Sequence, residues 1–274
     1  MLTNLMTWPR DLEFCILDFE TTGLYPQFGD RIVEYAYLVV KNGQIIDRGE
    51  GLVNPNRPMN PGATNANGIT DEMLRGKPRF DQVGGGLWHA IKNRVLVAHN
   101  ARFDLNCFAH ECKKVGWKQP DFQAIDSLKL SRSLLTGQPN NQLKTLANMV
   151  GHSWSGDAHR AMADVEALFT IMDYLFSQFT NKLNSINEIL ILGGIDKTNA
   201  DLQPLHDMSR TAQILLQNKG NPIQIIYNSK SSGTATRTIT PVELSMNNNI
   251  EFVDAYCHKR MTNRMFRVDR ISGI

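Results

Sequence analysis

Short apolar runs separated by polar turns dominate the first part of the chain. Residues 14–17 are uniformly apolar, which predicts a buried strand. Two further runs, at residues 32–40 and around Ile45 and Ile46, flank the dipeptide Asn42-Gly43, whose residue types favour a tight hairpin turn. This part of the chain is therefore predicted to form a strand, a loop and a β-hairpin.

Further along the chain, the apolar residues have helical spacing, which predicts helices at residues 80–91, 101–115, 143–150 and 161–176. Between these segments, residues 95–98 and 122–125 predict short strands. Strands that first follow one another and then alternate with helices indicate an α/β fold, in which a mixed β-sheet is flanked by helices.

A change in composition marks a domain boundary. Residues 181–207 are rich in Asn and contain Gly193-Gly194 and Pro204, although the run 189–192 is too apolar for a free linker. Beyond them we expect a helix at 208–218 and short strands at 223–227, 234–240 and 251–256. The predicted division is residues 1–180, a linker and connecting helix at 181–218, and a small β-domain at 219–274.

The charge is distributed unevenly between these parts, although the formal net charge of the 274 residues is only +2. Residues 1–180 hold 18 basic and 19 acidic side chains, whereas residues 219–274 hold 8 basic and 4 acidic ones. The basic C-terminal part favours an anionic partner, with a solvated basic face as the alternative.

Cysteine usage and hydropathy exclude several other classes. Four cysteines without a Cys-x-x-Cys spacing suggest neither a disulfide framework nor a zinc site. No run of about 18 apolar residues occurs to span a membrane, so no membrane partner is expected. A protein of the reducing cytoplasm is the interpretation that fits best.

The first candidate for chemistry is the sequence Asp18-Phe19-Glu20 at the end of the first apolar strand. Side chains two residues apart on a strand share a face, so both carboxylates project together. Their mutual repulsion and their hard oxygen ligands favour a bound Mg²⁺ or Mn²⁺. A solvated strand end is the structural alternative for this pair alone.

Two further candidates open helices. Asp104 follows the predicted strand 95–98, where an acid in the first turn could simply interact with the helix dipole. His159 and Asp164 stand at the start of the helix predicted at 161–176, where the histidine could equally be a surface residue or a cap. Taken together, the three stretches supply four carboxylates and one histidine, and this combination is what points to catalysis.

With these motifs, residues 14–176 resemble the DEDD superfamily of 3′-to-5′ exonucleases, which have an RNase H-like fold. The spacing of His159 and Asp164 resembles the histidine-containing branch, close to the epsilon proofreading subunit of bacterial DNA polymerase III. The resemblance implies that Asp18, Glu20, Asp104 and Asp164 bind two Mg²⁺ or Mn²⁺ ions, directly or through water. It also implies that His159 is the general base.

The resemblance further implies that Thr21, Leu24, Asn100 and Phe103 hold the terminal nucleotide. For Leu24 the alternative is ordinary loop packing, and for Phe103 it is a position in the core of its helix. The near-neutral charge of this part argues against a broad grip on a duplex, so single-stranded or frayed 3′ ends are the expected partner. The residues leave DNA and RNA both open, and DNA is the preferred hypothesis.

The C-terminal part resembles a WYL domain, a small barrel of the SH3 or Sm type found in bacterial regulators, although Glu251-Phe252-Val253 replaces the tripeptide that gives the family its name. The resemblance implies a pocket for nucleic acid or a nucleotide-like ligand. Its candidate residues are Tyr227, Arg237, Arg264 and Arg267. The alternative is that Tyr227 packs in the core and that the arginines form ion pairs, for example with Glu243 or Asp269.

The sequence therefore predicts a metal-dependent 3′-to-5′ exonuclease whose C-terminal domain binds nucleic acid or a regulatory ligand. Two alternatives remain. One is an enzyme that trims RNA 3′ ends, and the other is a ligand-responsive regulator that only binds nucleic acid. Oligomeric state cannot be deduced from the residues.

Overall fold

The computed structural model describes residues 8–118, 122–154, 160–183, 185–195, 209–230, 233–247 and 250–274. These residues form two compact units. Residues 8–24 and 30–195 make up the first unit, and residues 25–29 and 209–274 make up the second.

A six-stranded mixed sheet forms the centre of the first unit, with the strand order β3-β2-β1-β4-β5-β6. Its strands are β1 (Glu13–Thr21), β2 (Ile32–Lys41), β3 (Gln44–Leu52), β4 (Val95–Ala98), β5 (Gln123–Asp126) and β6 (Gly194–Ile195). The strand β1 pairs with β2 in antiparallel and with β4 in parallel orientation, so it lies in the middle of the sheet. The predicted hairpin at Asn42-Gly43 and the mixed sheet are confirmed.

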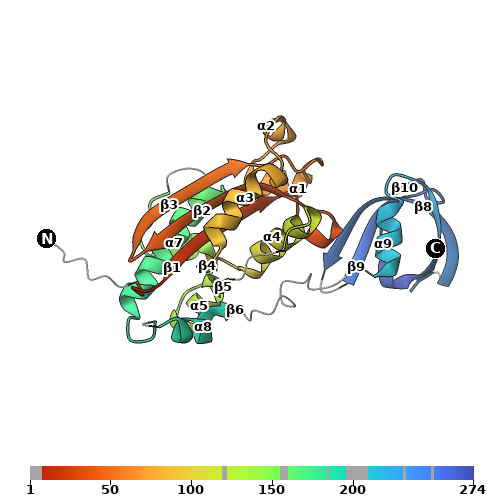
Figure 1. Ribbon diagram of the computed structural model, residues 1–274. Coiled ribbons are helices and arrows are strands. Elements are labelled where there is room, and N and C mark those ends of the chain that lie inside the picture. The colour runs from red at the N-terminus through yellow and green to blue at the C-terminus, as the bar shows by residue number, and fades with distance from the viewer. Residues whose placement is uncertain are drawn as a thin grey trace. The chain divides into compact units, whose positions relative to one another are not determined.

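Helices cover both faces of this sheet, with α3 and α4 in front of it and α7 behind it in Figure 1. The helices are α1 (Pro61–Asn67), α2 (Asp71–Leu74), α3 (Phe80–Ile91), α4 (Arg102–Lys114), α5 (Ser127–Leu134), α6 (Leu143–Met149), α7 (Ala161–Gln178) and α8 (Ile186–Gly193). The helices predicted at 80–91, 101–115, 143–150 and 161–176 are confirmed as α3, α4, α6 and α7.

The alternation of side chains along β1 explains where its carboxylates point. Phe14 and Ile16 are buried in the core beneath α7, whereas Leu17 is buried in the core beneath α3 and α4. Since successive side chains of a strand point to opposite faces, Asp18 and Glu20 continue the face of Phe14 and Ile16. The two carboxylates therefore face the side of the sheet that carries α7.

The apolar run at residues 189–192 belongs to α8, and its Ile189 is fully buried in the core of the first unit. The strand β6, which follows α8 directly, adds an antiparallel edge to β5. This segment therefore contributes a helix and a strand to the first unit, and its Ile186, Leu190 and Leu192 pack against the same core as Ile189.

The second unit contains a five-stranded antiparallel sheet with the order β10-β9-β8-β7-β11. Its elements are η1 (Pro26–Phe28), α9 (Arg210–Gln217), β7 (Ile223–Ser229), β8 (Gly233–Asn247), β9 (Ile250–Cys257), β10 (Thr262–Arg267), η2 (Val268–Arg270) and β11 (Ile271–Gly273). The core holds Phe28, Leu215 of α9, Ile225, Val253 and Phe266. The predicted strands are confirmed, whereas closure of the sheet into a barrel stays a prediction.

None of the helices in the described ranges is both long enough and apolar enough to cross a membrane.

Candidate active site

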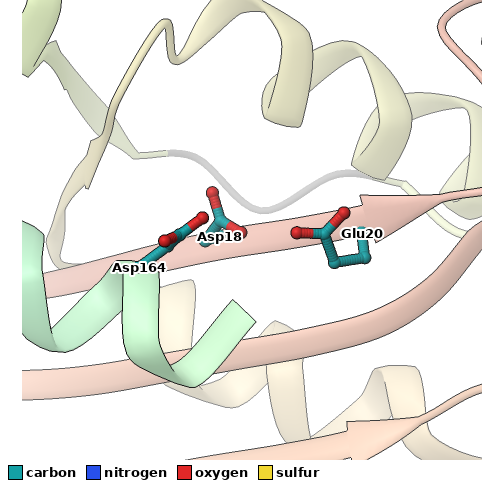
Figure 2. Close-up of side chains that lie close together, drawn as sticks. All are labelled: Asp18, Glu20 and Asp164. Atoms are coloured by element: carbon teal, nitrogen blue, oxygen red, sulfur yellow. The ribbon is translucent and has the colours of Figure 1, made fainter. Parts of the chain in front are cut away.

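Three carboxylates from two distant parts of the chain meet at one end of the central sheet. Asp18 and Glu20 come from β1, and Asp164 comes from the first turn of α7. Each residue offers an oxygen that lies within 4.8 Å of an oxygen of the other two. Figure 2 shows the carboxylates of Asp18 and Asp164 side by side and that of Glu20 turned back toward Asp18. Three acids this close define a candidate cation site.

The fourth predicted acid, Asp104, approaches from the opposite helical layer. It lies in the first turn of α4, is only 2% exposed, and accepts a hydrogen bond from the backbone N–H of Phe19 over 3.1 Å. Phe19 is the residue between Asp18 and Glu20, so this bond ties α4 directly to the acidic motif. Asp104 is not a member of the 4.8 Å group, but it is close enough for its charge to act on Asp18 of that group.

Burial and mutual repulsion make the ionised form of the carboxylates at the end of β1 unfavourable. Burial raises the pKa of Asp18 well above its ordinary value, and the neighbouring Asp104, Glu20, Asp164 and Glu34 raise it further. Burial also raises the pKa of Glu20 to about 8, against which a hydrogen bond from Asn67 acts.

The pKa of Asp104 is likewise well above its ordinary value because of burial, although backbone hydrogen bonds oppose the shift. A group of acids that are partly or fully buried and have raised pKa values is unfavourable as a set of bare anions. Divalent cations with a preference for oxygen ligands would relieve this repulsion, so the donor set fits Mg²⁺ or Mn²⁺.

The predicted base, His159, lies outside the described residues. The residue after it, Arg160, precedes α7 and binds a carboxylate that sequence reasoning missed, that of Glu34. Glu34 is 6% exposed and lies directly opposite Glu20 in the pairing of β1 with β2. The signal in the sequence is a lone acid within an otherwise apolar strand, since such an acid is seldom buried without a partner.

A second missed residue, Asn67, closes α1 and is 5% exposed. Its amide nitrogen donates to the carbonyl oxygen of Thr21 over 3.4 Å, its amide oxygen accepts from the N–H of Ile69, and it forms a hydrogen bond with Glu20. The dipeptide Asn67-Gly68 looks like an ordinary helix end in the sequence, which hides this role.

The predicted nucleotide-binding residues differ in exposure. Leu24 is 67% exposed, which contradicts the alternative of ordinary loop packing. Thr21 is buried, and its hydroxyl donates to the carbonyl oxygen of Gly23 over 2.6 Å. Asn100 is exposed, adopts a left-handed backbone conformation with φ of 64°, and its N–H donates to Asp126. Phe103 is half-buried against the core beneath α4, which favours its alternative role as a packing residue.

In the second unit, the strand register sorts the four predicted ligand residues onto two faces. Tyr227, Arg237 and Arg264 lie on the face that also carries the core residues, because Arg237 pairs with Ile225 and Arg264 pairs with Ala255. Tyr227 packs edge-on against Phe266 with ring centroids 5.1 Å apart.

The fourth residue, Arg267, lies on the opposite face and pairs with Phe252. Its guanidinium donates to both carboxylate oxygens of Asp269, over 3.0 and 2.6 Å, as in the alternative interpretation of the sequence. Glu251, which departs from the family pattern, accepts hydrogen bonds from the N–H and hydroxyl of Ser209, the N-cap of α9. The departure therefore serves to anchor α9 to β9.

The mixed sheet between two helical layers and its acidic end define the first unit as a nuclease domain with an RNase H-like fold. Residues 15–172 match the family model described as Exonuclease, and residues 217–274 match that of the WYL domain. The chain belongs to the exonuclease family, and its C-terminal part is a WYL domain.

Similar proteins include a DNA polymerase III PolC-type from Halalkalibacterium halodurans, 39% identical over 162 residues. Another is the 3′-5′ exonuclease DinG from Bacillus subtilis, 30% identical over 175 residues. These alignments cover 57% and 63% of this chain but only 11% and 18% of the relatives.

Solved structures resemble the same part of the chain. Exonuclease X in complex with 5′ overhanging duplex DNA is 26% identical, with a TM-score of 0.52, covering 65% of this chain and 98% of the other. The nuclease domain of 3′hExo, a DEDDh family member bound to rAMP, shares the fold at 18% identity and a TM-score of 0.55, covering 68% and 97% of the two chains.

Proposed function

We propose that this protein removes nucleotides from the 3′ ends of single-stranded or frayed DNA with the help of two divalent ions. The observation that carries the proposal is the meeting of Asp18, Glu20 and Asp164 within 4.8 Å, with Asp104 bound to the backbone between the first two. The names of the relatives, which include DNA polymerases and an exonuclease bound to DNA, favour DNA over RNA.

The four acids have distinct parts in this proposal. Asp18, Glu20 and Asp164 hold two Mg²⁺ or Mn²⁺ ions, and Asp104 binds through water or directly while its other oxygen keeps the hydrogen bond to Phe19. When bound, such ions stabilise the charge on the attacking and departing oxygens of a phosphodiester. His159 takes the proton of the attacking water, a task that suits a group with a pKa near neutrality.

The substrate end is held by groups around the acidic motif. Leu24 offers an exposed apolar surface next to the motif on which a terminal base can stack. Asn100 offers an exposed amide at the start of α4, close in sequence to Asp104. These two residues, with Thr21 and Phe103 as their supports, favour an unpaired end, because an unpaired base is free to stack on an apolar side chain.

For the C-terminal unit we propose binding of nucleic acid or a nucleotide-like ligand. We also propose that its sheet closes into a barrel. The support is the common face of Tyr227, Arg237 and Arg264, since guanidinium groups beside an aromatic ring suit phosphate and base together. Arg267 has a partner in Asp269 and contributes less.

The test of the nuclease proposal uses one single strand labelled either at its 5′ or at its 3′ end, with Mg²⁺, Mn²⁺ or EDTA. A 3′-to-5′ exonuclease shortens the 5′-labelled strand stepwise and releases the 3′ label first as a mononucleotide, only with metal. Asp18→Asn, which removes one charge and keeps the shape, should lower the rate at least 100-fold while the protein stays folded. Release in EDTA, or an unchanged rate in this variant, would refute the proposal. An RNA strand of the same sequence decides between DNA and RNA.

A further inference from the structure

The acidic end of β1 is bordered by an ion pair that lies outside the metal-binding group and joins a buried carboxylate to a partly exposed guanidinium. Arg160 Nη2 donates to Glu34 Oε1 over 2.6 Å, and its Nε donates to both carboxylate oxygens over 3.1 Å. The Glu34 side chain is 8% exposed and that of Arg160 is 41% exposed. Such a forked contact fixes both partners in direction as well as in distance.

The same carboxylate also closes the N-terminus of α7. Glu34 Oε2 accepts a hydrogen bond from the N–H of Ala161 over 3.1 Å, whereas Arg160, the N-cap residue, provides no side-chain cap of its own. A helix N-terminus has N–H groups without partners in the helix, and its dipole favours a negative charge there. Glu34 therefore supplies from β2 the cap that the sequence of α7 lacks.

A continuous path of bonds connects Glu34 to the metal-binding group. The N–H of Asp164 donates to the carbonyl oxygen of Arg160 over 3.1 Å, which is the first helical bond of α7. One end of this path is Glu34, opposite Glu20 in the sheet, and the other end is Asp164, whose carboxylate meets those of Asp18 and Glu20. The position of Asp164 relative to β1 thus depends on where Glu34 holds the start of the helix.

Stability alone is a poor explanation for this pair. Burying the charge of Glu34 has a desolvation cost, and an ion pair to the partly exposed guanidinium of Arg160 returns little net stability. Unlike apolar residues, the ion pair fixes the direction in which the start of α7 approaches β2. Glu34 itself is not part of the 4.8 Å group among the described residues, and both its oxygens are engaged by Arg160 and Ala161.

We propose that Glu34 and Arg160 form a positioning pair that fixes the first turn of α7, so that Asp164 stands at the correct distance from Asp18 and Glu20 to share a divalent ion. The inference rests on the proposed function for its catalytic consequence. Its structural content, the geometry of the ion-binding carboxylates, can be measured without any reaction.

The experiment compares the full-length parent with Glu34→Gln, Arg160→Lys and the double variant, using Mn²⁺ as the probe. Arg160→Lys keeps the charge and loses the fork, while Glu34→Gln keeps an acceptor for the Ala161 N–H. Mn²⁺ binding is titrated by electron paramagnetic resonance, and kcat and KM are measured on a single-stranded DNA. Thermal unfolding confirms that each variant is folded.

Arg94→Gln is the matched control. Arg94 donates to Glu13 at the other end of β1 and to two carbonyl oxygens at the end of α3, so it joins a carboxylate and a helix end in the same way. This variant should lose some stability and keep the Mn²⁺ affinity and kcat of the parent.

Each single variant is expected to weaken Mn²⁺ binding and lower kcat by about tenfold or more, with KM for DNA within about twofold of the parent. The double variant should be no worse than the poorer single one, because both changes remove the same contact. Three results would each overturn the proposal. The first is a double variant whose loss is the product of the two single losses, and the second is an unchanged Mn²⁺ affinity in the single variants. The third is a rise in KM confined to Arg160→Lys, which would show that Arg160 contacts DNA. A parent that binds Mn²⁺ without degrading DNA would refute the proposed function, and the Mn²⁺ titrations would still decide the positioning pair.

Discussion

Asp104 of α4 accepts a hydrogen bond from the backbone N–H of Phe19, which lies between the two acids of β1. One carboxylate thus serves two purposes. It satisfies a buried N–H group of a central strand, and it brings a negative charge to the border of the metal-binding group.

Two substitutions separate these purposes. Asp104→Asn keeps an oxygen acceptor for Phe19 but removes the charge, so we expect an unfolding free energy close to that of the parent and a rate at least 100-fold lower. Asp104→Ala leaves the Phe19 N–H without its partner and should also lower the unfolding free energy by about 1–3 kcal/mol. Urea denaturation and the nuclease assay measure the two effects. Equal stability of the two variants would show that the hydrogen bond is unimportant.

The stability of the metal-free protein should fall as the pH rises. Burial raises the folded-state pKa of Glu20 to about 8 from its ordinary 4.5, so between these values the folded state keeps a proton that the unfolded chain has released. Unfolding therefore becomes easier with rising pH through this window, and the raised pKa values of Asp18 and Asp104 act in the same direction.

Melting temperatures in EDTA at pH 5.5 and pH 8.5 test this dependence. We expect a lower melting temperature at pH 8.5, a smaller difference in Glu20→Gln, and a recovery with Mn²⁺, which binds the deprotonated acids. A melting temperature that rises with pH in EDTA would contradict the assigned pKa shifts.

The fold follows from the sequence where the pattern of a segment decides its structure. The predictions for 80–91 and 95–98 match α3 and β4 residue for residue, because a long amphipathic run and a short apolar run are each distinctive. The helices α1, α2, α5 and α8 have only four to eight residues, a length at which a helical period is seldom clear, although the equally short α6 was predicted. Their starts are set by side-chain caps, such as Thr70 before α2 and Asp126 before α5.

The site follows from the sequence only in part for a similar reason. The common face of Asp18 and Glu20 is a consequence of the two-residue period of a strand, which is local. The pairing of Glu20 with Glu34 depends on the register of β2, and the contact of Glu34 with Ala161 depends on how α7 docks. In the sequence, Glu34 is visible only as an acid in a strand and Arg160 only as an arginine before a helix, so their contacts with each other and with α7 cannot be predicted from it.

Leu24 provides a test of substrate contact that leaves the fold untouched. Since its side chain is 67% exposed, Leu24→Ala should change the unfolding free energy by less than about 0.5 kcal/mol. If a terminal base stacks on Leu24, the loss of that contact raises KM for a single strand about tenfold. Ile191→Ala is the matched control, because Ile191 is 77% exposed on α8. Equal KM values for the two variants would show that Leu24 has no role in binding.

The ion pair of Arg31 and Glu111 should contribute to folding. Both side chains are largely buried, at 12% and 2% exposure, and the guanidinium donates to both carboxylate oxygens over 2.6 and 2.7 Å. Glu111→Gln leaves the charge of Arg31 without its partner, which should lower the unfolding free energy by about 3–5 kcal/mol. Adding Arg31→Met should restore part of that loss. Urea denaturation of the three variants gives the answer, and a Glu111→Gln protein as stable as the parent would contradict it.

The two faces of the C-terminal sheet lead to a comparison between arginines. Arg237 and Arg264 share the face of Tyr227, whereas Arg267 lies on the other face and is bound to Asp269. If the face of Tyr227 binds phosphates, Arg237→Gln and Arg264→Gln should each weaken binding of a single-stranded oligonucleotide about threefold to tenfold and reduce its salt dependence. Arg267→Gln removes the same charge and should leave binding nearly unchanged, because Asp269 already neutralises it. Fluorescence anisotropy in EDTA, which prevents cleavage, at two salt concentrations measures all three. An equal loss in the three variants would mean that total charge, and not this face, attracts the nucleic acid.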